Sequence, residues 1–205
     1  MGRHREFDVQ KVLDAALNVF WRKGYEGASY ADLVEAAGVE RPALYSAFGN
    51  KEALFRQALA RYDELYLDYI PEALLLPTAR EVAAHILYNA ADLNTRYPDH
   101  TGCLGVNGAL AVSDDAEPVR QALIDFRAAG QAQLRARFER AKAEGDLPEQ
   151  AKPDALAAFV MAITHGMAVQ AKAGFSHDML KAVADQALST WPGNEKRSVS
   201  RKVAR

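Results

Sequence analysis

The stretch SYADLVEAAGVERPALYSAFGNKEALF, residues 29–55, predicts two short helices joined by a tight turn and followed directly by a third. Ser29 opens the first helix, because Asp32 three residues later completes a capping-box pattern, and Gly38 ends it. The next helix carries Pro42 in its first turn, where the missing N–H costs no hydrogen bond. This spacing is typical of a helix-turn-helix, although a plain structural corner between two helices has the same spacing.

The second of these helices has large apolar residues only on its back. Leu44 and Phe48 lie four residues apart, Gly49 ends the helix, and Asn50 caps the one after it. A helix that is apolar only at its back stands out from a small core, so its outer face is free to enter the major groove of DNA. The residues of that outer face are therefore candidates for nucleic-acid recognition.

The rest of the chain also favours helices, so the predicted fold class is all-α. Before the motif, apolar residues recur at helical spacing from about Asp8 to Lys23, and Gly24 follows as a terminating residue. A break is expected from Pro71 to Thr78. Further helices are expected on either side of the break, at residues 51–69, 79–96, 103–112, 119–144, 153–172 and 178–191.

The composition is that of a soluble globular protein. The chain has 205 residues, of which 49% are hydrophobic and 25% charged, and a formal net charge of −2. Its single cysteine excludes an intramolecular disulfide framework and a multi-cysteine zinc site, and the five histidines show no metal-ligand spacing. Residues 1–10 lack the apolar core of a secretory signal, and the uncharged run at 155–171 predicts a buried helix rather than a membrane span. We therefore expect a cytoplasmic protein without a metal or cofactor.

The residues of the motif carry a resemblance to a known family. The stretch GYEGASYADLVEAAGV, residues 24–39, followed by ALYSAFGNKEALF, residues 43–55, resembles the amino-terminal domain of the tetracycline-repressor (TetR) family of bacterial transcriptional regulators. The resemblance implies a three-helix DNA-binding head at residues 1–50 and a larger helical domain for ligand sensing and dimerisation at residues 51–192. Composition adds a basic tail at residues 193–205, which we expect to be disordered.

The resemblance also assigns roles in binding double-stranded operator DNA. Carried over position by position, the residues that face base edges are Arg41, Pro42 and Ala43, those that touch phosphates are Tyr45, Ser46 and Lys51, and those that contact the backbone from the preceding helix are Ser29 and Tyr30. The chemistry agrees, since arginine pairs bidentately with guanine and alanine meets a thymine methyl. The alternative for Arg41 and Lys51 is a solvated surface charge.

Two features depart from the family pattern. Glu40 stands where a small hydroxyl cap is usual, and a carboxylate beside DNA is either repelled by phosphates or reads a cytosine amino group. The head is also not basic, because eight acidic side chains balance eight basic ones in residues 1–56. Affinity for DNA must then come from local placement of charges and from two heads bound together.

Residues 153–191 predict a homodimer interface. The helix expected at 153–172 is apolar nearly all round, which a monomer of this size cannot hide on one face, and the helix after it adds Met179, Leu180 and Val183. The resemblance implies that these two helices form a four-helix interface with their counterparts in a second copy. The alternative is the buried central helix of a monomer.

The sequence also indicates residues that sense a signal. Polar and aromatic residues among apolar neighbours are candidates for lining a small-molecule pocket, namely His85, Tyr88, Asn107, Phe126 and His165. Cys103 stands at the expected start of a helix, where the helix dipole is expected to lower the pKa of its thiol, with Lys172 as its charge partner. The alternative is an inert buried cysteine among satisfied core residues.

Together these features predict a dimeric one-component transcription regulator, most often a repressor in the resembled family. It releases a palindromic operator when a small-molecule inducer binds or when an electrophile or oxidant modifies Cys103. One rival is a helical thiol peroxidase, for which the chain has no resolving cysteine. A second rival is a DNA-binding protein without an effector.

Overall fold

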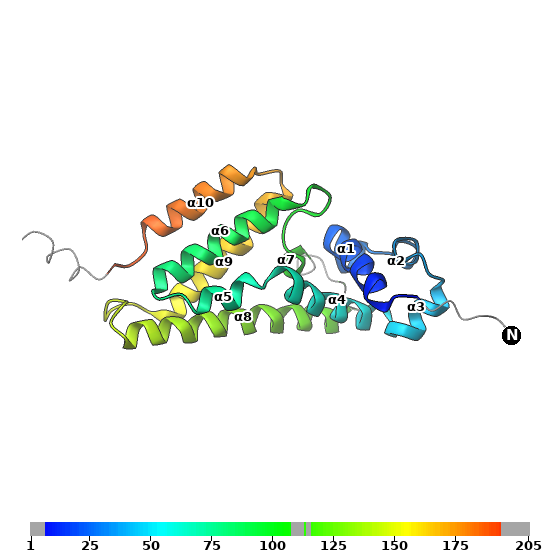
Figure 1. Ribbon diagram of the computed structural model, residues 1–205, viewed down its shortest axis with the longest axis horizontal. Helices are drawn as coiled ribbons and strands as arrows, with labels where there is room; N and C mark the ends of the chain where they lie inside the picture. The colour runs from blue at the N-terminus through cyan, green and yellow to red at the C-terminus, as the bar shows by residue number, and fades with distance from the viewer. Residues whose placement is uncertain (1–6, 108–112, 114–115, 194–205) are drawn as a thin grey trace, which may run out of the picture. The chain divides into compact units, whose positions relative to one another are not determined.

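The computed structural model describes residues 7–107, 113 and 116–193, and within these residues every regular element is helical. This confirms the predicted all-α fold. In chain order the elements are α1 (Val9–Gly27), α2 (Tyr30–Ala37), α3 (Arg41–Phe48), α4 (Lys51–Tyr66), α5 (Tyr69–Leu74), α6 (Ala79–Arg96), η1 (Pro98–His100), α7 (Leu104–Asn107), α8 (Glu117–Ala143), α9 (Pro153–Lys172) and α10 (His177–Ser189) (Figure 1).

The helices divide into two compact units. Unit 1 comprises residues 1–68 and 93–127, and unit 2 comprises residues 69–92 and 128–205. The predicted head at residues 1–50 lies wholly within unit 1. Helices α6 and α8 each contribute residues to both units.

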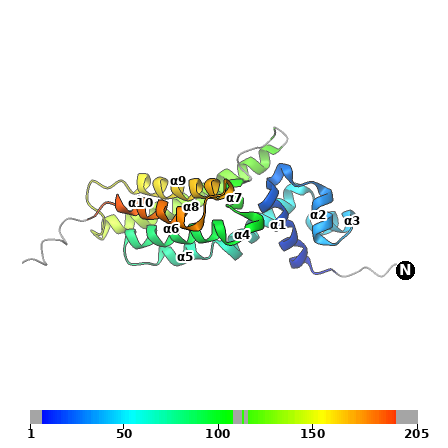
Figure 2. The same cartoon turned by 90° about the horizontal axis from the view of Figure 1, so that it is seen from above.

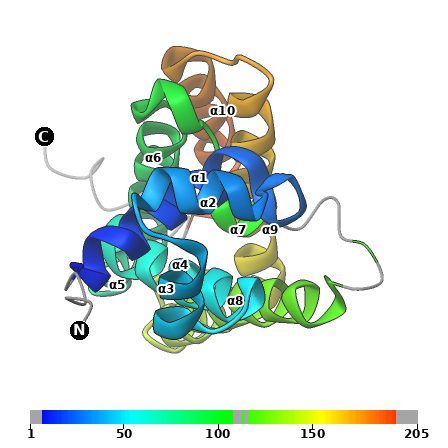
Figure 3. The same cartoon turned by 90° about the vertical axis from the view of Figure 1, so that its right-hand side faces the viewer.

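An aromatic core holds unit 1 together. Phe20 and Trp21 of α1 and Phe55 and Tyr62 of α4 are all fully buried, and α1 also packs against α2 and α7 (Figure 3). The Trp21 and Tyr62 rings meet edge to face with their centroids 4.8 Å apart. The Trp21 indole N–H donates to the carbonyl of Gly102 at 2.7 Å, which ties the segment before α7 to α1.

The stop signal predicted at Gly24 and the cap predicted at Asn50 are confirmed, and the structure adds a cap at Asp8. The helical backbone of α1 is interrupted at Gly24, which has φ 70° and ψ 178°, and a further short stretch runs on to Gly27. Asp8 caps α1 by accepting hydrogen bonds from the N–H groups of Gln10 and Lys11. Asn50 caps α4 in the same way, with its side chain 2.8 Å from the N–H of Ala53.

A single hydrophobic core holds unit 2 together, built from α5, α6, α9, α10 and the second half of α8. Figures 1 and 2 show α6, α9 and α10 running alongside one another. Arg137 of α8 is only 5% exposed, and its guanidinium donates to the carbonyls of Leu76 and Pro77 at 2.7 and 3.0 Å. These bonds fix the turn between α5 and α6 against α8.

Some predicted boundaries are wrong or lie outside the described residues. The break expected from Pro71 begins later, because α5 runs from Tyr69 to Leu74 with Pro71 in its first turn, where proline fits a helix. The helix expected at residues 51–69 ends at Tyr66. Of the helix expected at 103–112, the structure describes only the part that ends at Asn107, and the predicted tail lies, apart from Gly193, outside the described residues.

Helix α9 is exposed on one side in the single chain. Among the described residues, α9 is the one helix whose length and composition would allow it to span a membrane. Of its 18-residue apolar window, 28% is buried. Ala157, Val160 and Met167 face the core, whereas Phe159 and Val169 are 37% and 43% exposed. The prediction of a buried helix therefore holds for one face only.

Candidate functional site

The helix-turn-helix of unit 1 consists of α2, a turn at Gly38, and α3. The Ser29 hydroxyl accepts a hydrogen bond from the Asp32 N–H at 3.1 Å, and the Asp32 carboxylate accepts one from the Ser29 N–H at 3.0 Å, so the predicted capping box is present. Lys23, 2.6 Å away, together with these bonds lowers the pKa of Asp32. Gly38 has φ 63° and donates to the carbonyl of Val34, which ends α2 and frees the chain to turn.

Helix α3 packs its apolar side against the core and leaves its polar side in solvent. Leu44 and Phe48 are each 3% exposed. The residues predicted to face DNA are accessible on the other side, with Arg41, Pro42 and Ser46 exposed and Ala43 and Tyr45 half-buried. Their individual contacts with bases and phosphates stay predictions.

The structure brings three of the predicted DNA-binding residues together at the start of α3. The guanidinium carbon of Arg41 lies 4.5 Å from the ring centroid of Tyr30 and 5.4 Å from that of Tyr45. Nη2 of Arg41 donates to the Tyr45 hydroxyl at 3.2 Å. These contacts raise the pKa of Arg41, and hydrogen bonds from Tyr30 and Arg41 lower the pKa of Tyr45.

Lys51 is half-buried rather than extended into solvent. Its ammonium lies 4.4 Å from the ring centroid of Tyr25, a cation–π contact, and burial lowers the pKa of Lys51. Its backbone N–H donates to the Tyr30 hydroxyl at 3.3 Å. The sequence pattern did not indicate Tyr25 as a partner of Lys51, because the two residues are 26 positions apart and meet only through the packing of α1 against α4.

Glu40 occupies the N-cap position of α3 without a side-chain capping bond. Its carboxylate is exposed, and only its backbone carbonyl takes part, accepting from the N–H groups of Ala43 and Leu44. The helix nevertheless begins at Arg41, so the departure from a hydroxyl cap does not move the start of α3.

Cys103 lies directly before α7, but the expected lowering of its thiol pKa is wrong. Burial raises the pKa of the thiol and outweighs a hydrogen bond with Tyr62 and bonds from the N–H groups of Val106 and Gly105, which lower it. The helix start therefore acts on the sulfur as predicted. Its effect on the pKa is smaller than that of burial. A sequence pattern places a cysteine along a helix but does not show how deeply the thiol is buried.

Asn107 and Phe126 lie close to Cys103 within unit 1. The Asn107 N–H donates to the carbonyl of Cys103 at 2.8 Å, and its side-chain amide donates to the carbonyl of Trp21 at 3.3 Å. The Phe126 ring packs on Gly105, where an added Cβ would meet it at 3.1 Å. Asn107 thus holds backbone together, and its predicted role in sensing stays a prediction.

The other predicted sensing residues belong to unit 2, namely His85, Tyr88, His165 and Lys172. The Tyr88 hydroxyl donates to the Asp185 carboxylate of α10 at 2.6 Å. The ring nitrogen Nε2 of His85 is buried without a hydrogen-bond partner among the described residues. Partial burial lowers the pKa of Lys172. Its pairing with Cys103 stays a prediction, because the two residues belong to different units.

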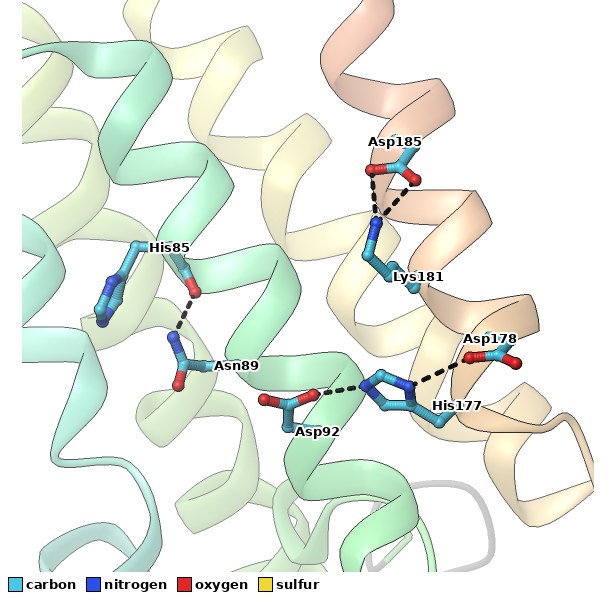
Figure 4. A network of polar contacts seen from close by, with 7 residues as sticks. All are labelled: His85, Asn89, Asp92, His177, Asp178, Lys181 and Asp185. Atoms are coloured by element: carbon cyan, nitrogen blue, oxygen red, sulfur yellow. Dashed lines mark hydrogen bonds and ion pairs between the residues drawn. The ribbon is translucent and has the colours of Figure 1, made fainter.

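A polar network between α6 and α10 was not predicted (Figure 4). Nε2 of His177 lies 2.5 Å from the Asp92 carboxylate, and Nδ1 lies 3.5 Å from Asp178. Lys181 pairs with Asp185 at 3.0 Å. The helical register of α10 shows the pair of Lys181 and Asp185, but the contact of His177 with α6 needs the packing of the two helices.

No metal-binding site is evident in the part of the chain that the structure describes. No three His, Cys, Asp or Glu side chains come together there in a group that could hold a metal ion.

Comparison with protein families extends the resemblance to most of the chain. A model of the bacterial regulatory proteins of the tetR family matches residues 12–58, and a model of the tetracyclin repressor-like C-terminal domain matches residues 83–187. The chain is 34% identical over 193 residues to the HTH-type transcriptional repressor ComR of Escherichia coli K12, which covers 93% of this chain and 92% of ComR. It is 26% identical over 186 residues to the repressor BdcR of the same organism, covering 91% and 90%.

Solved structures agree with the family models. A cysteine mutant of the TetR family transcriptional regulator CifR, complexed with 26-base-pair double-strand operator DNA, is 40% identical with a TM-score of 0.87, and the match covers 93% of this chain and 100% of that chain. Reduced NemR of E. coli shares the fold at 21% identity, with a TM-score of 0.68 over 87% and 94% of the chains. These similarities identify a DNA-binding regulator rather than an enzyme, which sets aside the alternative of a thiol peroxidase. The chain belongs to the TetR family of transcriptional regulators.

Proposed function

We propose that this protein is a dimeric repressor that binds a palindromic operator through α2 and α3 and releases it when an effector acts on the larger helical domain. The exposed outer face of α3, backed by the buried Leu44 and Phe48, is the observation that carries this proposal. The names of ComR and BdcR as repressors, and the operator complex of CifR, support it.

In this proposal the outer face of α3 meets the major groove. Arg41, Pro42 and Ala43 face base edges, because they lie in the first turn of the helix, which enters the groove first. Tyr45, Ser46 and Lys51 bind phosphates, and Ser29 and Tyr30 lie at the sugar-phosphate backbone from the start of α2. The acidic Asp32 and Glu26 lie among these residues with partners of their own, Lys23 for the first and Ser113 for the second.

Dimerisation through α9 and α10 follows from the exposed apolar side chains of these two helices. Phe159 and Val169 of α9 and Met179 of α10 are 37%, 43% and 52% exposed in the single chain, although the other faces of these helices are buried. A second copy related by two-fold symmetry covers the same residues on both protomers. This is the interface predicted at residues 153–191.

A small molecule is the effector that the structure supports best. His85 carries a buried ring nitrogen without a partner among the described residues, and a buried polar atom of this kind gains a hydrogen bond when a ligand donates to it or accepts from it. In Figure 4 the ring of His85 points away from the polar network of α6 and α10. We assign ligand recognition to His85 and, with it, to His165 and Tyr88 of the same unit.

Modification of Cys103 is the second route to release. The thiol is next to α7 and receives hydrogen bonds that favour its thiolate, but burial raises its pKa, so reaction with an electrophile is slow unless the segment around α7 opens. Cys103 is half-buried and its sulfur forms a hydrogen bond with the fully buried Tyr62, so a covalent adduct on it would disturb that contact. The adduct would therefore displace α4 or α7, which contact each other.

Release follows from the geometry of two heads on one DNA. Two recognition helices must match major grooves about 34 Å apart on one side of the duplex. Helix α4 follows α3 after only Gly49 and Asn50, so a movement of α4 changes the position of its head. An effector that favours a different spacing of the heads weakens both half-sites at once.

The test is selection of an operator from random double-stranded DNA with the purified, reduced protein. We expect one enriched palindrome. Its dissociation constant is then measured before and after reaction of the protein with one equivalent of N-ethylmaleimide, for the wild type and for Cys103→Ser, which removes the nucleophile at little cost in volume.

The outcomes separate the two routes of release. Loss of binding after treatment in the wild type, and retention in Cys103→Ser, assigns release to Cys103. Binding that is indifferent to treatment assigns release to a non-covalent ligand or leaves a DNA-binding protein without an effector, and a screen of small molecules against wild type and His85→Ala separates these. Absence of any enriched sequence would contradict the proposed function itself.

A further inference from the structure

The guanidinium of Arg41 is held in place although the residue is exposed. Its carbon Cζ lies 4.5 Å from the Tyr30 ring centroid and 5.4 Å from the Tyr45 ring centroid, both within the range of a cation–π contact. The two rings lie 5.3 Å apart at an angle of 33°. Nη2 of Arg41 also donates to the Tyr45 hydroxyl at 3.2 Å. Two aromatic rings and one hydrogen bond thus fix a side chain that otherwise samples many rotamers.

Tyr30 connects this arginine to the rest of the head. Its hydroxyl accepts a hydrogen bond from the backbone N–H of Lys51, the first residue of α4, at 3.3 Å. The Tyr30 ring also lies against the Tyr45 ring, with their centroids 5.3 Å apart. A chain of contacts therefore runs from α4 through Tyr30 to Tyr45 and Arg41 on α3.

The start of α2 makes Tyr30 a firm support. Tyr30 is the first residue of α2, directly after the Ser29 N-cap, and the capping box of Ser29 and Asp32 fixes the backbone there. Lys23 holds the Asp32 carboxylate from α1 at 2.6 Å. The Tyr30 ring is half-buried, so it packs on one side while it supports Arg41 on the other.

An arginine side chain that is already held in one orientation binds a base edge at a lower cost in conformational entropy than a mobile one. Recognition of guanine by arginine needs two N–H groups in one plane at O6 and N7, and an unrestrained side chain loses conformational entropy when it adopts that orientation. Tyr45 takes one of the five N–H donors of the guanidinium, which leaves enough for a bidentate pair.

We propose that Tyr30 is a positioning residue for base reading, whose ring and hydroxyl hold Arg41 in the orientation in which it meets a guanine edge. This inference rests on the sequence-specific DNA binding proposed above. It adds to the backbone contact of Tyr30 proposed above and can be separated from it, because loss of a backbone contact weakens binding to every sequence equally, whereas loss of positioning lowers discrimination only at the base pair that Arg41 reads.

The test compares base discrimination among variants of the full-length protein. The dissociation constant is measured for the selected operator and for each single base-pair change in one half-site. Arg41→Ala identifies the base pair that Arg41 reads, as the position at which discrimination falls about 10-fold or more. Tyr30→Leu removes the ring and the hydroxyl, Tyr30→Phe removes the hydroxyl alone, and Arg80→Ala in unit 2 is the charge-matched control for Arg41→Ala.

We expect Tyr30→Leu to lose discrimination at the same base pair as Arg41→Ala, by about 3- to 10-fold, and to leave the other positions unchanged. Tyr30→Phe restores most of that discrimination because it keeps the ring. The double variant Tyr30→Leu/Arg41→Ala discriminates no worse than Arg41→Ala alone, since the two residues act as one unit. Weaker binding with unchanged discrimination at the base pair that Arg41 reads, or additive losses of discrimination in the double variant, would overturn the proposal.

A measurement without DNA covers the case in which Tyr30→Leu does not fold. The side-chain Nε–Hε resonance of Arg41, assigned by its absence in Arg41→Lys, is expected to be shifted upfield by the tyrosine rings in the wild type and in Tyr30→Phe. A resonance at the position of a free arginine would overturn the proposal.

The outcomes also separate this proposal from the proposed function. If the wild type shows no base preference at any position, the proposed function fails. If it does, but Arg41→Ala alters none, the proposed function stands and the positioning role of Tyr30 fails.

Discussion

Trp21 shows how one polar atom orders a buried region. The side chain is fully buried, and its indole N–H donates to the carbonyl of Gly102 at 2.7 Å, 81 positions along the chain. The same ring contacts Tyr62, Tyr66 and Tyr97 edge to face. The bond therefore anchors the segment that carries Cys103 to the helix that supports the DNA-binding motif.

We predict that Trp21→Phe lowers the free energy of unfolding by about 1–3 kcal/mol, because the buried Gly102 carbonyl loses its donor. Urea unfolding followed by far-ultraviolet circular dichroism measures the change. The matched control is Trp191→Phe, whose buried indole N–H has no partner among the described residues, so its removal costs no hydrogen bond. Equal losses in the two variants would contradict the role of the hydrogen bond.

Cys103 marks the limit of inference from single residues in the sequence. The pattern placed it correctly at the start of a helix, and the N–H groups of Gly105 and Val106 do favour its thiolate. The direction of the pKa shift came out opposite, because the sulfur is buried and burial dominates. Burial depends on residues such as Tyr62, which arrives from α4 and is 41 positions away.

At the scale of helices, local chemistry made most of the fold predictable. The starts of α2 and α4 were predicted from Ser29 and Asn50, and the end of α2 from Gly38, since each signal acts within a few residues of chain. Helix α5 was missed because Pro71 was taken as a breaker. In the structure Pro71 lies in the first turn of α5. A backbone N–H there has no partner within the helix, so the N–H that proline lacks costs no hydrogen bond.

The contact of α6 with α10 contains a histidine whose pKa depends on the packing of the two helices. His177, the first residue of α10, lies 2.5 Å from Asp92 of α6, with Asp178 beside it (Figure 4). Asp92 and, to a lesser degree, Asp178 raise the pKa of His177 above its ordinary value of about 6.5. The protonated imidazole is then the form that joins the two helices.

We predict that this pair stabilises the protein at acidic rather than alkaline pH. Because the pKa of His177 is higher in the folded protein than in the unfolded chain, the stabilisation is complete below the unfolded value and disappears as the pH rises through the folded value. The difference in thermal midpoint between wild type and His177→Gln, measured from pH 5 to pH 9, should shrink over that range. Asp92→Asn serves as the paired control and should reproduce the behaviour of His177→Gln. A difference that is constant with pH would contradict the prediction.

At the scale of the whole molecule, exposed apolar side chains on α9 and α10 support the proposed dimer. The sequence showed that α9 is apolar nearly all round, and the structure buries one face and leaves Phe159 and Val169 exposed. Exposed apolar side chains on two neighbouring helices fit a two-fold interface with a second copy. A dimer presents two copies of α3, and two weakly charged heads bind a palindrome far better than one.

The most direct test is the stoichiometry of the complex with a selected palindromic operator. Sedimentation velocity with fluorescently labelled duplex gives the number of protomers bound, and titration of a duplex carrying one intact and one scrambled half-site gives the contribution of the second head. We predict two protomers on each palindrome and a loss of at least 100-fold in affinity when one half-site is scrambled, since the second binding event is then lost. One protomer on the palindrome, with equal affinity for the scrambled duplex, would contradict a dimeric operator-binding regulator.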